Sequence, residues 1–176
     1  MHTLNIPSAL RQFASLHRDE RNIILHMVCL PLIVLSAAFL FNTLLSPWGQ
    51  GVINLVYWLL LGLMTLCYVR FAGLLGFTSS IAIILICIVG HVLSQWGGSF
   101  AALLTGFILL LFAYTLHRLG HWYEGNYRTF PLTFSLIAAA PLFVTARALQ
   151  QHPYFKAICH SLDQQAGPIY VRDMAN

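Results

Sequence analysis

Two short polar clusters hold the residues of this chain whose types and spacing can do chemistry. The first is HRLGHWYEGN, residues 117–126, in which His117, His121 and Glu124 follow the spacing i, i+4 and i+7. On an α-helix this spacing keeps the three side chains within about 40° of one face. Two imidazoles and a carboxylate on one face can bind a divalent metal ion, and non-haem iron often takes such a set.

The second cluster is HRDERNIILH, residues 17–26, in which Asn22 and His26 lie one helical turn apart. His17 precedes His26 by nine residues and would point to the other side of a continuous helix. His17 can therefore join His26 only if the chain bends before Asp19. Because Asp is a preferred N-cap residue, we expect the helix to begin at Asp19 and the bend to precede it.

Composition places these clusters in a membrane protein. Charged residues make up 8% of the chain and apolar residues 59%, against about 25% and 45–50% in soluble domains. No Asp, Glu, Lys or Arg occurs in residues 22–69, 71–117 or 129–146. Since a spanning helix needs about 20 residues, the first two runs can hold two spans each and the third at most one. We therefore predict an all-α, polytopic bundle, a single integral-membrane domain over residues 1–176.

The expected elements follow from these runs. We predict four spanning helices over about 19–45, 52–69, 73–93 and 100–124, the last ending at Gly125-Asn126. Residues 1–16 should form an N-terminal segment with a short amphipathic helix in the membrane interface, and residues 150–176 a polar tail. The fifth apolar segment, 130–149, is short. We expect Pro141 to break it into a hairpin that enters and leaves on one membrane face.

The arginines predict the orientation of the bundle. Six of them precede the first helix, follow the second or follow the fourth, and the two other turns have no Lys or Arg: Arg11, Arg18, Arg21, Arg70, Arg118 and Arg128. Because cytoplasmic loops are enriched in Lys and Arg, this places both polar clusters at the cytoplasmic face. One metal site is then expected from His17, His26, His117 and His121.

The remaining histidines should lie elsewhere. His91, late in the third helix, is expected near the opposite face, beyond a hydrocarbon core of about 30 Å, and should have a structural role. His152 and His160 in the tail are expected to be solvated. The net charge of +4 fits the cytoplasmic bias of membrane proteins, and no groove-sized alternation of basic and aromatic residues suggests nucleic-acid binding. The four cysteines form no CxxC motif and are expected to be small apolar residues.

Five polar residues have candidate roles beside the imidazoles. Glu124 is either a third metal ligand or a group that orients His121. Asn22 and Asn126 are candidates to hydrogen-bond ligands or substrate. Arg18 and Arg21 either set the topology or bind a substrate carboxylate by bidentate pairing.

The two clusters resemble the two signatures of the Mpo1-like family. HRDERNIILHMVCLPL is similar to the N-terminal signature, and GHWYEGN with Pro131 and APLF, residues 140–143, is similar to the second. The resemblance implies an Fe(II)-dependent dioxygenase that uses O₂ to shorten 2-hydroxy fatty acids by one carbon, in fatty acid α-oxidation. It also implies metal ligands from His17, His26 and His121. His117 stands where that pattern has Gln, and Thr145-Ala146-Arg147 where it has an acidic residue.

Other functions remain open from the residues alone. A haem-binding electron carrier would use two of the histidines as axial ligands, and a non-catalytic membrane protein would use them only for packing. A di-iron hydroxylase or desaturase usually has adjacent histidine pairs, which this chain lacks. The short turns are bacterial in style, so an inner membrane is the expected location, with membrane lipid as a partner. The sequence makes no prediction of oligomeric state.

Overall fold

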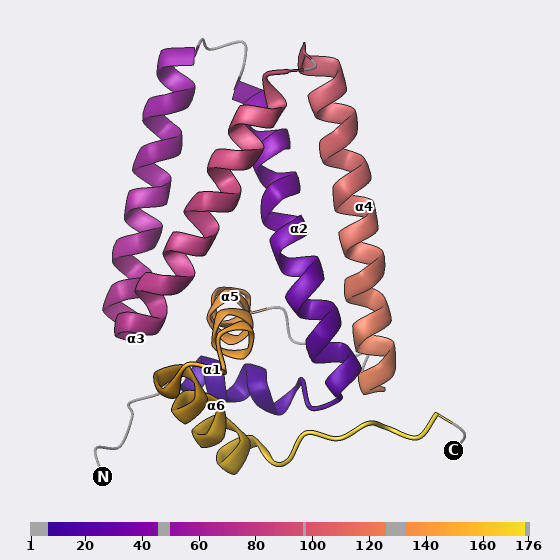
Figure 1. Ribbon diagram of the computed structural model, residues 1–176. Helices are drawn as coiled ribbons and strands as arrows, with labels where there is room; N and C mark the ends of the chain where they lie inside the picture. The colour runs from indigo at the N-terminus through magenta and orange to yellow at the C-terminus, as the bar shows by residue number, and fades with distance from the viewer. Residues whose placement is uncertain (1–6, 46–49, 97, 126–132, 175–176) are drawn as a thin grey trace. The chain divides into compact units, whose positions relative to one another are not determined.

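The computed structural model describes residues 7–45, 50–96, 98–125 and 133–174. The fold is all-α, as predicted (Figure 1). Its helices are α1 (Ser8–Ser15), α2 (Glu20–Leu45), α3 (Gln50–Ser94), α4 (Gly98–Glu124), α5 (Phe134–Ala148) and α6 (Pro153–Ala166). The β-pairing found within the described ranges is one isolated parallel bridge between Asp19 and Tyr170.

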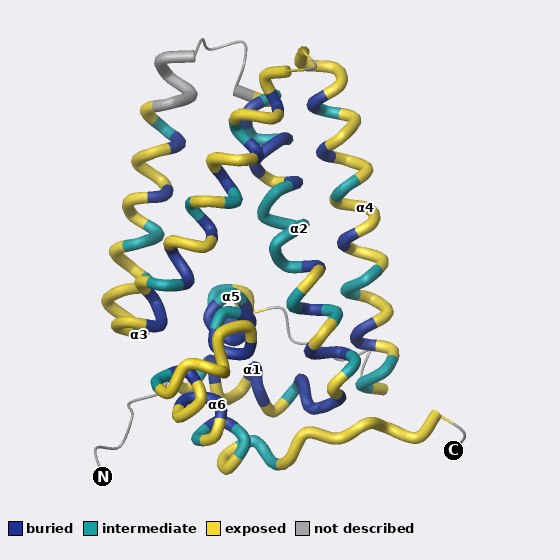
Figure 2. Tube along the Cα trace, in the orientation of Figure 1, coloured by how far each residue is buried: buried dark blue, intermediate teal, exposed yellow. Residues whose placement is uncertain are grey.

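Three helices are long and apolar enough to cross a membrane, over Glu20–Leu44, Leu55–Ser94 and Gly98–Glu124. Much of the surface of α3 and α4 is exposed (Figure 2). This exposed surface includes large apolar side chains such as Leu66, Phe107 and Leu111. Soluble monomers rarely expose apolar patches of such extent, whereas lipid tails would cover them favourably.

Helix α3 changes direction at Gly73. This residue has φ 54° and ψ −126°, which is not helical and which residues with a Cβ rarely adopt. Figure 1 shows the two limbs of α3 folding back on one another at this kink. The observed kink therefore lies at the predicted boundary between the second and third apolar helices, which the sequence placed at residues 70–73.

The chain forms two compact units. Residues 31–114 form one, with most of α2, all of α3 and most of α4. Its core is a cluster around Tyr57, Leu61, Ile83 and Cys87. The Tyr57 hydroxyl donates to the Cys87 carbonyl (2.8 Å) and joins the two limbs of α3.

The other unit comprises residues 1–30 and 115–176. Helices α1, α5 and α6 contact one another here. The apolar residues of α1, Leu10, Phe13 and Ala14, are buried. The predicted short amphipathic helix is thus present, and protein covers its apolar side.

Helix α5 corrects the prediction of a break at Pro141. The helix runs without interruption from Phe134 to Ala148. An interior proline costs about 3 kcal/mol because it removes one helical hydrogen bond. Burial of side chains on both sides of it outweighs that cost: Leu136, Ala139, Ala140, Leu142, Phe143, Val144 and Ala146. At 15 residues α5 is too short to span a core of about 30 Å.

Helix α6 lies within residues 150–176, which the sequence predicts to be a polar tail. His152 caps its N-terminus by accepting from the Tyr154 backbone N–H, and Pro153 occupies the first turn. Phe155, Ile158 and Leu162 repeat at helical spacing and are buried. After Gly167 the chain is extended and reaches the start of α2, where Tyr170 pairs with Asp19.

Candidate metal centre

The site is built around the corner between α1 and α2. Helix α1 ends at Ser15 and α2 begins at Glu20, so the bend lies before Asp19 as predicted. Asp19 is the N-cap: its Oδ1 accepts a hydrogen bond from the Arg21 backbone N–H (2.9 Å). The bend turns His17 back toward α2, where its ring centroid lies 4.5 Å from that of His26.

Three histidines come together at this corner. His17, His26 and His121 are each at most 4% exposed. One ligand atom from each lies within 4.8 Å of the other two. Since zinc, and similar divalent ions, bind imidazole nitrogen at about 2.0–2.1 Å, small side-chain rotations would bring all three onto one ion. The convergence of the two sequence clusters is therefore confirmed for these three residues.

Backbone carbonyls set which ring nitrogen faces the centre. His17 Nδ1 lies 2.8 Å from the Phe13 carbonyl oxygen, and His26 Nδ1 lies 2.9 Å from that of Asn22. Because a carbonyl only accepts, both Nδ1 atoms carry the hydrogen, and each Nε2 keeps its lone pair. Metal-binding histidines are commonly oriented in this way. His26 Nε2 is buried and has no hydrogen-bond partner among the described residues.

Aromatic rings close one side of the triad. Phe13 stacks on His17 with ring centroids 4.0 Å apart, and Phe143 of α5 lies 5.3 Å from Phe13. Both phenylalanines are buried. Burial lowers the pKa of His17 to about 3, even though the hydrogen bond to Phe13 acts in the opposite direction. His17 is therefore neutral at physiological pH, the form that a metal ion requires.

His117 lies beside the triad rather than in it. Its ring centroid is 4.8 Å from that of His26 and 4.5 Å from that of His121. Its Nδ1 is buried and, within the described ranges, has no hydrogen-bond partner. The donor set that contains His117 comprises His26 and Cys29 instead.

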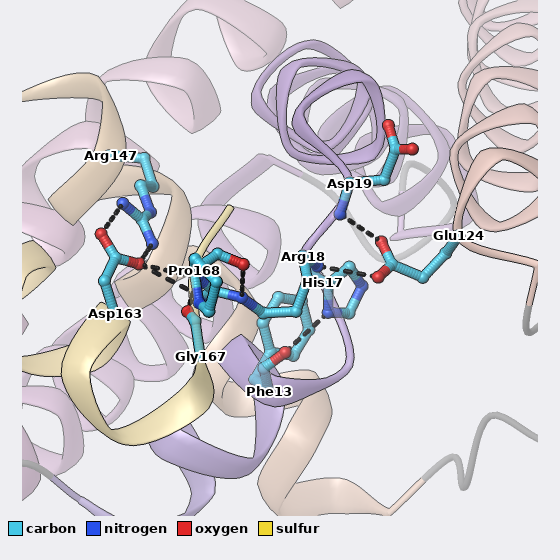
Figure 3. A network of polar contacts seen from close by, with 9 residues as sticks. All are labelled: Phe13, His17, Arg18, Asp19, Glu124, Arg147, Asp163, Gly167 and Pro168. Atoms are coloured by element: carbon cyan, nitrogen blue, oxygen red, sulfur yellow. Dashed lines mark hydrogen bonds and ion pairs between the residues drawn. The ribbon is translucent and has the colours of Figure 1, made fainter. Parts of the chain in front are cut away.

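The Glu124 carboxylate stabilises the corner between α1 and α2. Figure 3 shows it accepting hydrogen bonds from the backbone N–H groups of Arg18 (2.8 Å) and Asp19 (3.0 Å). Asn22 Nδ2 donates to the same carboxylate (2.8 Å). Both carboxylate oxygens are thus used to fix the bend that holds His17. The geometry favours an orienting role over metal ligation, but the histidine whose position Glu124 fixes is His17 rather than the predicted His121.

Arg18 is buried in an ionic network with residues that are distant in the sequence. Its guanidinium group lies 3.1 Å from Asp163 of α6 and donates to the carbonyls of Gly167 and Pro168 (Figure 3). Arg147 of α5 binds the same carboxylate at 2.5 Å. Burial raises the pKa of Asp163, but the hydrogen bonds and charges of the two arginines outweigh this and hold it below its usual value. The network ties α5 and α6 to the corner.

Arg21 is also engaged by protein groups. It donates to both oxygens of Asp19 (3.0 and 2.7 Å) and to the Arg172 carbonyl (2.7 Å), and it lies 4.3 Å from the centre of the Tyr123 ring. A substrate carboxylate would have to displace Asp19 from Arg21, or Asp163 from Arg18. The extended C-terminal segment adds a hydrogen bond from the Arg172 N–H to Asp19 (2.8 Å).

Asn22 and Gly120 determine how closely α2 and α4 approach. A Cβ on Gly120 would lie 2.5 Å from Asn22 Oδ1 and 3.4 Å from His26 Nδ1. A glycine is therefore required in the Gly-His pair of the second cluster. Asn22 is fully buried, and its Oδ1 has no hydrogen-bond partner among the described residues.

The remaining candidates are not members of the triad or lie outside the described residues. Asn126 is not among the described residues. His91 belongs to the unit of residues 31–114, where Asn42 (2.9 Å) and Gln95 (3.0 Å) engage its two nitrogens, in keeping with a structural role. His152 and His160 are exposed, as predicted.

Residues in the C-terminal third of the chain support the site and were not predicted from the sequence. Asp163 and Arg172 bond to Arg18 and Asp19 at the corner between α1 and α2. The backbone of Tyr170 pairs with Arg18 and Glu20 at the same corner. One signal was present: the apolar stripe Phe155, Ile158, Cys159 and Leu162 indicates a helix packed on its neighbours. The partners of that helix have no local signature.

The site fits a metal ion better than packing alone or haem. A buried polar atom without a partner costs about 1–3 kcal/mol, and His26 Nε2 lacks one among the described residues. An ion bound by the triad would satisfy this nitrogen. Haem is not favoured, since the rings of His26 and His121 contact edge to face, 5.2 Å apart, where a porphyrin would have to lie between them.

Comparison of the chain with family models, with curated proteins and with solved structures found no match.

Proposed function

We propose that this protein is an integral-membrane, non-haem iron dioxygenase that shortens 2-hydroxy fatty acids by one carbon. The observation that carries the proposal is the buried triad of His17, His26 and His121, whose ligand atoms lie within 4.8 Å of one another. Neutral imidazole is a good ligand for iron, and three such ligands leave positions for substrate and O₂. The identity of the metal and of the substrate rests on the resemblance to the Mpo1-like family.

The residues around the triad have distinct tasks in this proposal. His17, His26 and His121 would hold Fe(II), which would supply the activation of O₂ and a site for the 2-hydroxycarboxylate, chemistry that side chains lack. Phe13 and Phe143 exclude water from one side of the site. Glu124 holds the corner that carries His17. Asn22 Oδ1 is a buried acceptor beside His26 that is placed to receive a hydroxyl.

Arg18 and Arg21 take a structural part in this proposal. Each guanidinium group already binds a carboxylate of the protein. Releasing a buried ion pair to bind a substrate would cost several kcal/mol. We therefore assign the substrate carboxylate to the metal and the arginines to the corner.

The membrane arrangement follows from the apolar helices. We propose four crossings, with α2, the two limbs of α3 and α4 each spanning once, and with the triad at the cytoplasmic face of a bacterial inner membrane. The kink at Gly73 and the distribution of the arginines support this topology. The acyl chain of the substrate would then lie among lipid-exposed apolar side chains, with its carboxylate at the membrane surface.

The test is turnover by the detergent-purified protein after anaerobic loading with Fe(II). We expect O₂ uptake that depends on a 2-hydroxy fatty acid, with a product one carbon shorter. His121→Ala should abolish uptake, and His91→Ala, in the other unit, should leave it unchanged. Iron-loaded protein that consumes no O₂ with 2-hydroxy acids of any chain length, or an active His121→Ala variant, would disprove the proposal.

A further inference from the structure

A second donor set lies directly beside the triad. Cys29 follows His26 by three residues on α2, and both approach His117 on α4. The Cys29 sulfur and one ring nitrogen from each histidine lie within 4.8 Å of one another. Cys29 and His26 are at most 1% exposed. These three residues belong to the unit of residues 1–30 and 115–176, so the set lies within one compact body.

Each of the three donor atoms is available to an ion. The Nδ1 of His26 is used by the Asn22 carbonyl, which leaves Nε2, and this atom has no hydrogen-bond partner among the described residues. The same holds for His117 Nδ1. The Cys29 thiol makes a long contact of 3.9 Å with the His26 carbonyl, which is a weak hydrogen bond. Cys67, by contrast, is exposed.

The chemistry of this set differs from that of the triad. The triad offers three nitrogens, whereas the second set offers two nitrogens and a sulfur. Thiolate is a soft ligand and favours Zn(II), Cd(II) and Cu(I) over Fe(II). Binding replaces the thiol proton, so one proton leaves for each metal–sulfur bond that forms.

We infer that His26, Cys29 and His117 form a second metal position, selective for thiophilic ions, that competes with the triad for His26. A single ring nitrogen binds one ion, so His26 Nε2 cannot serve both positions at once. A thiophilic ion therefore withdraws His26 from the triad and lowers its affinity for Fe(II). The second metal position does not depend on the proposed enzymatic function, because Cys29 and His117 are not members of the triad.

Titration of the metal-free, detergent-purified protein with Cd(II) tests this inference. Cadmium bound to thiolate gives a charge-transfer absorption in the near ultraviolet. We expect this band in the unmodified protein, in Cys67→Ser and in His17→Ala, and its loss in Cys29→Ser and Cys29→Ala. His117→Gln should weaken Cd(II) binding and leave Fe(II) binding unchanged, which shows that the variant is folded.

The outcomes separate this inference from the proposed function. A cadmium band that persists in His17→Ala while Fe(II) binding is lost supports both positions. A band in a protein that neither binds iron nor turns over supports the second position alone. No band in the unmodified protein and in His17→Ala, or a band of equal intensity in both Cys29 variants, overturns the inference.

Discussion

Replacing Glu124 by Ala should loosen the corner that holds His17. The substitution removes the acceptor of two backbone N–H groups and of the Asn22 side chain. Arg18, Asp19 and Asn22 are at most 5% exposed, so water cannot readily replace the lost acceptor. A hydrogen bond to a charged group contributes about 1.5–3 kcal/mol. Because the carboxylate is itself half-buried, we expect a loss of about 3–5 kcal/mol rather than the full sum.

The loss should appear in both stability and metal affinity. For a chain of this length, about 1 kcal/mol corresponds to roughly 2–4 °C in Tm, so Tm should fall by roughly 6–20 °C. Residues that orient metal-binding histidines typically change affinity by about 10–100-fold, and we expect a loss of that size for Fe(II). Glu124→Gln keeps one acceptor oxygen, so its Tm and its Fe(II) affinity should lie between those of the unmodified protein and of Glu124→Ala.

The matched control is Glu20→Ala. Glu20 is an exposed acidic residue in the first turn of α2, near the same helix end. Its removal should cost at most about 1 kcal/mol, the size of a charge–dipole interaction at a helix terminus. Tm is measured by thermal unfolding of the metal-free protein in detergent, and affinity by anaerobic Fe(II) titration. If Glu124→Ala behaves like Glu20→Ala in both assays, Glu124 does not brace the corner.

Three further changes test the surroundings of the site. Gly120→Ala should lower Tm and Fe(II) affinity, since its Cβ would lie 2.5 Å from Asn22 Oδ1; Gly62→Ala, with no atom within 4 Å, should do neither. The pKa of Asp163 lies below its usual 3.8 when folded, so the unfolded chain takes up that proton first as pH falls. The stability that Asp163 provides should be complete above about pH 4 and lost below it, and the difference in Tm from Asp163→Asn should shrink accordingly; a difference that grows with acid would contradict this. Removing residues 167–176 should lower Tm and Fe(II) affinity, because their bonds to Arg18, Asp19 and Glu20 are lost; a truncated protein with unchanged Tm would refute that contribution.

The features that the sequence predicted are those with local causes. Asp19 caps α2 because an Asp before an apolar run can satisfy the first N–H groups of the helix. The kink at Gly73 lies where a charged residue and a glycine interrupt the apolar run. The convergence of His17 and His26 with His121 was predicted from the expected topology, in which an even number of crossings would return the chain to the same face.

The features that it did not predict depend on distant partners. Glu124 shares a helical face with His121, which suggests a common ion, yet its partners are backbone N–H groups more than 100 residues earlier. No spacing rule reveals that contact. Arg18 was a candidate to bind a substrate carboxylate because its actual partner, Asp163, lies far along the chain in α6 and no sequence pattern links the two residues. Pro141 was expected to break α5, but burial of its neighbours overrides the local preference.

The metal content of the purified protein tests the central claim most directly. Protein purified anaerobically in detergent, loaded with Fe(II) and freed of excess metal is analysed for iron per chain. The shared triad of His17, His26 and His121 predicts about one iron per chain in the unmodified protein and in His91→Ala, and almost none in His17→Ala or His121→Ala. Equal iron in all four proteins, or none in any of them, would contradict it.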